Sequence, residues 1–264
     1  MTQTDNDADE GRDWQGRELS CETCRYKELQ AQGKCEFKRA CVYDRYVRRI
    51  MRFFERNPQL ANEHLRDDYF ETRAIASKHA DVFRLPPMLD DPDETVRWVA
   101  ASRLPHSYLL KLRNDPHREV RIRIVSRFSD SELVGMISDP DYYVRTMIAR
   151  RLSPAVLPMM IHDKEVQVRR TVAARIDPAW LMRMAHDPDA DVRLAVSERL
   201  PPEQLEAMIG DQDWRVRYEV AGRIARERLS ALIDDPDPMV RERVVQRLSG
   251  PAFEGPAASE THLR

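Results

Sequence analysis

A single pattern recurs every 24 residues from residue 67 onward, and this repeat restricts the possible folds more than any other feature of the chain. Each copy opens with Asp and carries Arg six residues later. Val precedes that Arg in every copy except the first, where Thr72 stands. Eight copies in register predict a solenoid, in which each repeat packs mainly on its neighbours. The opening residues are Asp67, Asp91, Asp115, Asp139, Asp163, Asp187, Asp211 and Asp235, and the arginines are Arg73, Arg97, Arg121, Arg145, Arg169, Arg193, Arg217 and Arg241.

Each copy is predicted to contain two helices. In residues 187–210 (DPDADVRLAVSERLPPEQLEAMIG), with the opening Asp as position 1, positions 6, 10 and 14 fall on one helical stripe. The opening Asp is interpreted as the N-cap, with Pro at N1. The first helix, of roughly 13 residues, is ~20 Å long. About seven residues remain for the second limb, which runs back along the first, and they span ~14 Å as a 3₁₀-helix but only about half of the first helix's length as an α-helix. We therefore predict an all-α fold of α-helices alternating with short 3₁₀-helices.

Two rows of arginine run along the repeats. The Arg at position 7 lies about 20° from position 14 around the helix, inside the apolar arc, so its charge requires a buried partner. We expect opening Asp residues of the same or a neighbouring copy to pair with it. Position 13 lies about 120° away and is interpreted as a solvated face, with binding to an acidic protein or RNA as the alternative. Its residues are His79, Arg103, Arg127, Arg151, Arg175, Arg199, Arg223 and Arg247.

All four cysteines, Cys21, Cys24, Cys35 and Cys41, lie in one short block with the spacing C-x2-C-x10-C-x5-C. The acidic N-terminus is not a secretory signal, so we expect a cytoplasmic protein, where clustered cysteines are more often metal ligands or redox groups than disulfides. The spacing leaves zinc and an iron–sulfur cluster as alternatives and modestly favours the cluster. Four thiolate ligands would leave no open coordination position on a zinc ion or on an iron–sulfur cluster, which argues against Lewis-acid catalysis.

Composition and motifs exclude several classes of function. A third of the residues are charged, yet the net charge is −2, which argues against a polyanion binder that relies on bulk charge. We find no phosphate-binding glycine loop, no HExxH and no nucleophile–base pair, and therefore expect no enzymatic activity and no small-molecule substrate. No apolar run reaches the ~20 residues of a membrane helix. Another protein is the expected partner, with nucleic acid less favoured.

The chain is expected to divide into four segments. A polar lead-in is predicted to be disordered, a metal module with a capping helix precedes the repeats, and the last residues form a tail. The cysteine module could serve simply as the N-terminal cap of the solenoid. The expected boundaries are 1–17 for the lead-in, 18–66 for the module, 67–250 for the eight repeats and 251–264 for the tail.

The repeat (DPDxxVR…A…RL…L..M) and the cysteine block ahead of it together resemble the leucine-rich repeat variant family over roughly residues 18–250. The resemblance implies a [4Fe–4S] cluster held by Cys21, Cys24, Cys35 and Cys41. It also implies alternating α- and 3₁₀-helices in a right-handed superhelix, and it suggests a bacterial protein with a link to nitrogen fixation. The family brings no settled biochemical role.

Three functional hypotheses follow from these features. The first is a protein-interaction module whose cluster is structural or redox-responsive. The second is an electron-transfer protein that docks to an oxidoreductase. The third is a nucleic-acid-binding solenoid with a zinc cap held by the four cysteines.

Overall fold

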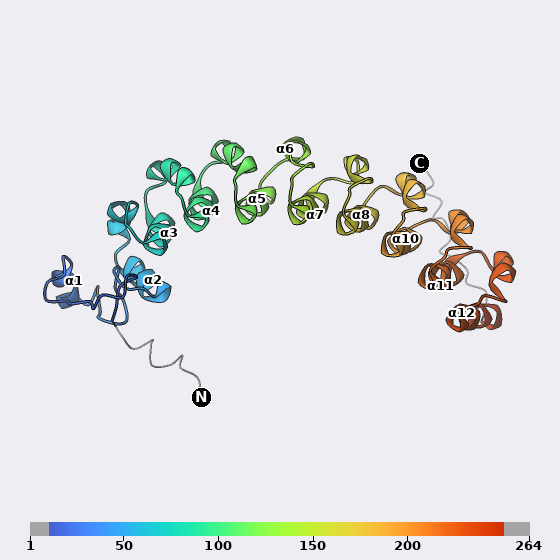
Figure 1. The fold of residues 1–264 in the computed structure, drawn as a ribbon, viewed down its shortest axis with the longest axis horizontal. Coiled ribbons are helices and arrows are strands. Elements are labelled where there is room, and N and C mark those ends of the chain that lie inside the picture. The colour runs from blue at the N-terminus through green and yellow to red at the C-terminus, as the bar shows by residue number, and fades with distance from the viewer. Residues whose placement is uncertain (1–10, 251–264) are drawn as a thin grey trace, which may run out of the picture. The chain divides into compact units, whose positions relative to one another are not determined.

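A computed structural model describes residues 11–250, which divide into two compact units, one ending at Ser129 and the other beginning at Asp130 (Figure 1). Apart from two isolated β-bridges, every regular element in this range is a helix. No helix among these residues combines the length and the hydropathy needed to span a bilayer.

In the first unit, α-helices alternate with 3₁₀-helices, which are labelled η. The expected alternation is therefore confirmed here. The elements are α1 (Lys27–Ala31), α2 (Val47–Arg56), η2 (Pro58–His64), α3 (Phe70–His79), η3 (Val82–Arg84), η4 (Pro86–Asp90), α4 (Glu94–Arg103), η5 (His106–Asn114) and α5 (Arg118–Val125).

The second unit follows the same plan, except that two of its short limbs contain an α-helical turn. The elements are α6 (Asp130–Val134), α7 (Tyr142–Arg151), η6 (Leu157–Met160), α8 (Val166–Ala173), α9 (Pro178–Leu181), η7 (Met182–Met184), α10 (Ala190–Ser197), η8 (Pro202–Met208), α11 (Trp214–Arg223), η9 (Arg226–Leu232) and α12 (Pro238–Ser249).

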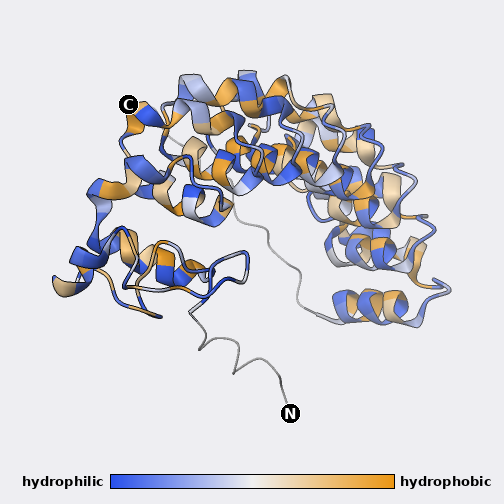
Figure 2. Ribbon diagram, turned by 60° about the vertical axis from the view of Figure 1, so that its left-hand side comes forward, coloured by the Kyte–Doolittle hydropathy of each residue, from blue (hydrophilic) through white to orange (hydrophobic). Residues whose placement is uncertain are grey.

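Both limbs of each copy contribute residues to the core. Position 6 is fully or almost fully buried in every repeat, and the Leu at position 19 of the short limb is also buried. Figure 2 shows that the helices carry both hydrophobic and hydrophilic residues, as expected for elements with one buried stripe. The buried position-19 residues are Leu85, Leu109, Leu133, Leu157, Leu181, Leu205 and Leu229.

The N-cap prediction was wrong by two residues. The α-helices begin near position 4, and α4, α7 and α11 contain ten residues rather than about 13. At α4 the N-cap is Asp93, whose Oδ1 accepts from the N–H of Thr95 at 2.8 Å. The opening Asp91 accepts instead from the N–H of Asp93 at 2.9 Å, and both of its oxygens also accept from Arg73 of the preceding copy.

Replacing an N-cap should destabilise the protein measurably. In Asp213→Ala, the N–H of Arg215 loses the carboxylate that it contacts at 2.8 Å, and we expect the free energy of unfolding to fall by about 1 kcal/mol. Urea unfolding of the variant and of Asp213→Asn, which retains a capping oxygen, measures this loss. Equal stability of Asp213→Ala and the native chain would contradict the assignment.

An additional, degenerate copy precedes the eight repeats. We expected only a capping helix after the cysteines, but α2 and η2 reproduce the layout of an α-helix followed by a 3₁₀-helix. Arg49 stands at position 7 of this copy, residues 43–66, and the fully buried Ala61 stands at position 19. Because Tyr43 replaces the opening Asp, the copy is hidden from a search for the repeat.

Residues 11–17, which we expected within a disordered lead-in, form a turn. Asp13 Oδ1 accepts from the backbone N–H groups of Gln15 at 2.9 Å and Arg17 at 2.8 Å. Trp14 stacks on Tyr69, with the ring centroids 5.8 Å apart. This part of the expected lead-in therefore packs on the chain, whereas residues 1–10 and the expected tail, 251–264, lie outside the described residues.

Candidate metal centre

The structure brings the four sequence-predicted ligands into one neighbourhood as free thiols. Cys35 and Cys41 are buried, Cys21 and Cys24 are half-buried, and α1 lies between the two pairs. Burial, followed by the charges of Cys24 and Cys21, raises the pKa of Cys35 to about 11. Burial is also the main cause that raises the pKa of Cys41 to about 12, with Cys35 and Cys24 contributing. These mutual effects require the thiols to lie near one another.

A backbone turn and two further hydrogen bonds fix the second pair of cysteines. Glu36 and Ala40 exchange backbone hydrogen bonds of 2.9 and 2.8 Å around a turn with Lys38 at φ 61°. The thiol of Cys35 donates to the carbonyl of Ala40 at 3.2 Å. The N–H of Cys41 donates to the carbonyl of Arg49 at 3.1 Å, which ties this cysteine to α2.

Backbone N–H groups point at three of the four sulfur atoms. The N–H of Tyr26 lies 3.4 Å from the sulfur of Cys24. The N–H groups of Glu36 and Tyr43 oppose the burial effect by lowering the pKa of Cys35 and Cys41, respectively. Hydrogen bonds to sulfur stabilise metal-bound thiolates and tune iron–sulfur clusters. The donor set and its surroundings therefore fit a thiolate-ligated metal centre.

The thiols are near one another but not yet in a coordination arrangement. Among residues 11–250, no three His, Cys, Asp or Glu side chains are placed so that they could hold one metal ion. Cys21 and Cys24 lie on a loop without regular structure ahead of α1.

A buried aromatic cluster joins the cysteine block to the repeats. The ring of Tyr26 packs against Tyr43 and Phe53, at centroid distances of 6.0 and 5.4 Å. His64 packs against Phe54 at 5.5 Å and contacts the hydroxyl of Tyr26. Sequence reasoning missed Tyr26 and His64, although His64 interrupts an apolar position of the degenerate copy.

The predicted Asp–Arg ladder is confirmed within both units. The position-7 guanidinium binds both carboxylate oxygens of the Asp that opens the following copy, 18 residues later. Its third nitrogen donates to the carbonyl of its own opening Asp, as Arg97 does to Asp91 at 2.9 Å. The pairs are Arg73–Asp91, Arg97–Asp115, Arg145–Asp163, Arg169–Asp187, Arg193–Asp211 and Arg217–Asp235, with Nε–Oδ2 distances of 2.7–2.8 Å.

The second arginine row is exposed or half-buried, as its interpretation as a solvated face requires, but its guanidinium groups also bind the backbone of the preceding copy. Arg103 donates to the carbonyls of Ser77 at 2.8 Å and Ala80 at 2.5 Å, at the C-terminal end of the preceding helix. These carbonyls lack partners within their own helix, and a cation also complements the negative end of the helix dipole. Arg127, Arg175, Arg199, Arg223 and Arg247 make the equivalent bonds.

The ladder makes stability depend on pH in acid. The hydrogen bond from Arg217 is the main cause that lowers the pKa of Asp235. A lowered folded-state pKa contributes stability above the unfolded pKa of about 3.9, and this stability is lost as pH falls through the folded value. We expect the stability difference between the native chain and Asp235→Asn, measured by urea unfolding, to be constant near neutrality and to shrink below about pH 4. A pH-independent difference would contradict this.

Comparisons with known proteins agree with the class that the fold and the site define, a helical repeat protein with an N-terminal cysteine module. Residues 11–63 match the family described as "LRV protein FeS4 cluster", and residues 190–213 match the family described as "Leucine rich repeat variant". A solved structure described as a leucine-rich repeat variant with a novel repetitive protein structural motif is 38% identical, with a TM-score of 0.82. The match covers 87% of this chain and 98% of that chain. The chain belongs to the leucine-rich repeat variant family.

A second relative matches over a shorter range. A protein of Rhodobacter capsulatus, described as an uncharacterized 27.7 kDa protein in the nifB 3′ region, is 48% identical over 96 residues. The alignment covers 36% of this chain and 39% of that protein. The family membership, the helical repeats and the cysteine module with its FeS4 family match thus confirm the resemblance seen in the sequence.

Proposed function

We propose that the chain is a non-enzymatic protein-interaction module and that Cys21, Cys24, Cys35 and Cys41 hold a [4Fe–4S] cluster. The cluster would stabilise the cysteine block or respond to redox state. When bound, it would supply a one-electron couple, while the chain's own residues bury it and donate backbone hydrogen bonds to its ligands. A cytoplasmic location and a link to nitrogen fixation remain part of this proposal. The description of the Rhodobacter capsulatus relative supports that link.

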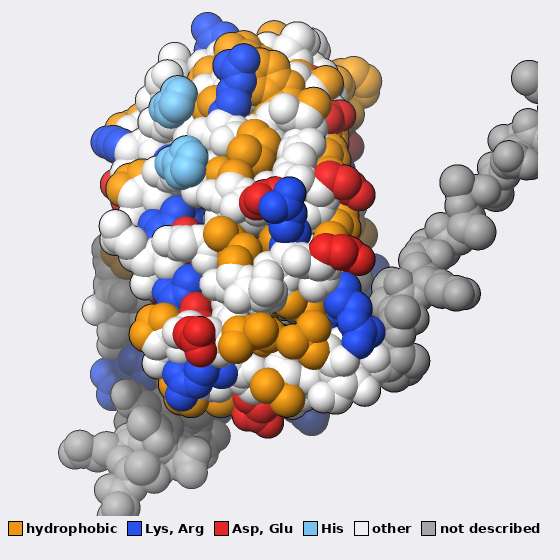
Figure 3. All heavy atoms as spheres, turned by 90° about the vertical axis from the view of Figure 1, so that its right-hand side faces the viewer, with side chains coloured by type: hydrophobic (Ala, Val, Ile, Leu, Met, Phe, Trp, Pro, Cys, Tyr) orange, Lys and Arg blue, Asp and Glu red, His pale blue; other side chains and the backbone are white. Residues whose placement is uncertain are grey.

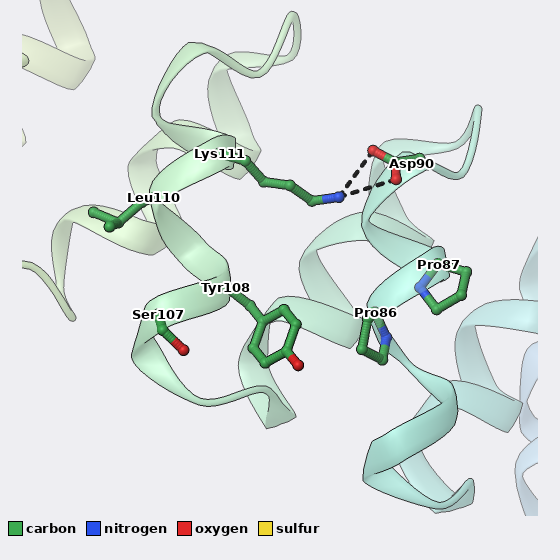
Figure 4. A pocket seen from close by; sticks show the side chains of 7 residues that line it. All are labelled: Pro86, Pro87, Asp90, Ser107, Tyr108, Leu110 and Lys111. Carbon is green, nitrogen blue, oxygen red and sulfur yellow. Dashed lines mark hydrogen bonds and ion pairs between the residues drawn. The ribbon is translucent and has the colours of Figure 1, made fainter.

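A groove in the first unit is the observation that carries the interaction role. It has a volume of about 650 Å³ and lies between η4 and η5 (Figure 4). Pro86, Pro87, Leu110 and the ring of Tyr108 line it, and an ion pair between Lys111 and Asp90 spans one end. Leu110 and Tyr108 are more than 40% exposed, and clustered exposed apolar side chains favour a protein partner.

The arginine rows argue against the nucleic-acid alternative. Nucleic-acid binding requires Lys and Arg side chains that are free to neutralise phosphates, which releases counterions from the nucleic acid. The arginines of both rows instead bind carboxylates and backbone carbonyls of the same chain, as Arg97 and Arg103 do. Electron transfer to an oxidoreductase remains the second candidate, because two of the thiols are only half-buried and a cluster there would lie close to solvent.

Affinity capture under anaerobic conditions tests the interaction role. The immobilised native chain should retain a specific protein from an extract of its source, and the immobilised Tyr108→Ser variant should fail to retain that protein. Tyr143→Ser in the second unit is the matched control, because Tyr143 is 40% exposed and Tyr108 is 43% exposed. Equal retention by both variants, or retention of nucleic acid that falls steeply with salt, would contradict the proposal.

A further inference from the structure

His64 breaks the repeat pattern where the cysteine block meets the repeats. It occupies position 22 of the degenerate copy, residues 43–66, and each of the next seven copies has Met or Leu at this position. His64 is only 5% exposed, so a polar ring stands in a layer that is otherwise apolar. A buried imidazole is tolerated only when its nitrogens are hydrogen-bonded. The residues of those seven copies are Met88, Leu112, Met136, Met160, Met184, Met208 and Leu232.

Both ring nitrogens of His64 have partners. Nδ1 lies 3.2 Å from Oδ2 of Asp67, and Nε2 lies 2.8 Å from the hydroxyl of Tyr26. A carboxylate accepts, so Nδ1 of His64 is the donor toward Asp67. The Tyr26 hydroxyl, which also donates to Oε2 of Glu63 at 3.5 Å, bonds to Nε2. The hydrogen-bond chain therefore joins the Asp that opens the first repeat to a residue beside a predicted metal ligand.

Tyr26 acts on Cys24 through its backbone. Its N–H donates to the sulfur of Cys24, while its side chain, 7% exposed, is held by His64 and by the ring of Phe53. Any movement of the Cys24 loop must therefore break the contact with His64 or carry His64 with it. The ion pair between Arg25 and Glu63, at 2.6 Å, connects the same two segments at the surface.

A second buried contact ties the other cysteine pair to the same copy. Asn57, which is fully buried, donates from Nδ2 to the carbonyl of Lys34 at 2.7 Å. Lys34 precedes Cys35, so both halves of the cysteine block are anchored on the segment that joins α2 to the first repeat.

We propose that Tyr26 and His64 are positioning residues that hold Cys24 for metal binding by tying it to the start of the first repeat. This inference rests on the proposed role of the four cysteines as metal ligands. A bound metal would hold the Cys24 loop in place and so favour the contact between Tyr26 and His64, and that contact favours metal binding by the same free energy. Residues that orient metal ligands in this way typically contribute tenfold or more to metal affinity, roughly 10–100-fold.

The test measures zinc affinity of the full-length, reduced, metal-free chain by competition with a chromophoric chelator. Tyr26→Phe removes only the hydroxyl, and His64→Met installs the residue that most later copies have at this position. We expect each variant to bind zinc about tenfold more weakly. His64→Met also leaves the buried hydroxyl of Tyr26 with the longer contact to Glu63, at 3.5 Å, so we expect the thermal stability of the metal-free chain to fall as well, and the control below separates that loss from the effect on zinc.

Asp91→Asn is the matched control. It removes the carboxylate that Arg73 contacts at 2.7 Å in the first rung of the ladder and is therefore expected to weaken the repeats without changing zinc affinity. Hydrogen exchange gives a second readout: zinc should slow exchange in η2 of the native chain, and this protection should be lost in His64→Met.

Zinc affinities of both variants within about twofold of the native chain would overturn the proposal. Equal weakening by Asp91→Asn would also overturn it, because the effect would then be general destabilisation. A native chain that binds neither zinc nor an iron–sulfur cluster would instead contradict the metal function proposed for the cysteines and thereby remove the basis of this inference.

Discussion

The Cys41→Ala chain, purified without oxygen, is expected to lose nearly all of its cluster, falling from about four irons per chain to below about one. Cys41 is 8% exposed, and its backbone N–H is bonded to Arg49 at the end of a tight turn. The chain has no fifth cysteine that could replace it. Loss of the cluster also removes the cross-link between the two cysteine pairs, so the cysteine block should become sensitive to proteolysis.

Iron and sulfide assays, with limited proteolysis of the same samples, measure this effect. Ser20→Ala is the matched control because Ser20 lies directly before Cys21 and accepts only a local bond from the N–H of Glu22 at 3.3 Å. That control should retain the native metal content. A Cys41→Ala chain that keeps about four irons would contradict the assignment of this residue as a ligand.

Breaking one rung of the ladder is the second large expected effect. In Arg145→Met, the carboxylate of Asp163 remains buried without its cation, and two backbone carbonyls lose a donor. Only 4% of the Arg145 side chain and 7% of the Asp163 side chain are exposed. Removal of one partner from such a buried pair is expected to lower the free energy of unfolding by about 3–5 kcal/mol.

Arg241→Met provides the comparison at the same repeat position. Arg241 is exposed and donates to the carbonyls of Asp235 and Pro236, with no carboxylate partner among the described residues. We expect Arg241→Met to lower the free energy of unfolding by no more than about 1 kcal/mol.

The last helix, α12, also leaves Val245 and Leu248 exposed. Figure 3, which views the molecule from this side, shows hydrophobic side chains among charged ones.

Urea unfolding of both variants in a Trp14→Phe, Trp98→Phe background, followed by the fluorescence of Trp180 and Trp214, distinguishes them, since the two remaining tryptophans belong to the second unit. Similar, small losses for Arg145→Met and Arg241→Met would show that the ladder contributes little to stability. Repeat proteins can unfold in more than one step, so each transition is fitted separately.

The ladder could be predicted from the sequence because helical geometry places the position-7 guanidinium inside the apolar arc, where it needs a partner. The N-cap could not, because two Asp residues stand close together in each DPD motif. Local capping rules favour either Asp, but the carboxylate of Asp91 binds Arg73 of the preceding copy and does not cap the helix. That choice depends on a contact 18 residues away in the sequence.

The partners of the position-13 row could not be predicted for a related reason. They are backbone carbonyls, as for Arg103. Every residue has a backbone carbonyl, so the amino-acid pattern does not indicate which ones bind the arginines. The four cysteines were visible from composition and spacing, whereas their support was not. Tyr26 and His64 lie 38 residues apart, and only the fold places the hydroxyl against the ring.

Cys21, Cys24, Cys35 and Cys41 are proposed to hold an iron–sulfur cluster at the start of a helical repeat protein. The most direct measurement is the visible spectrum of the native chain purified without oxygen, with iron, sulfide and zinc assayed in the same sample. We predict absorbance near ~400 nm that bleaches with dithionite and about four irons per chain. A colourless chain with about one zinc and no sulfide would contradict the cluster and leave a zinc-capped repeat protein.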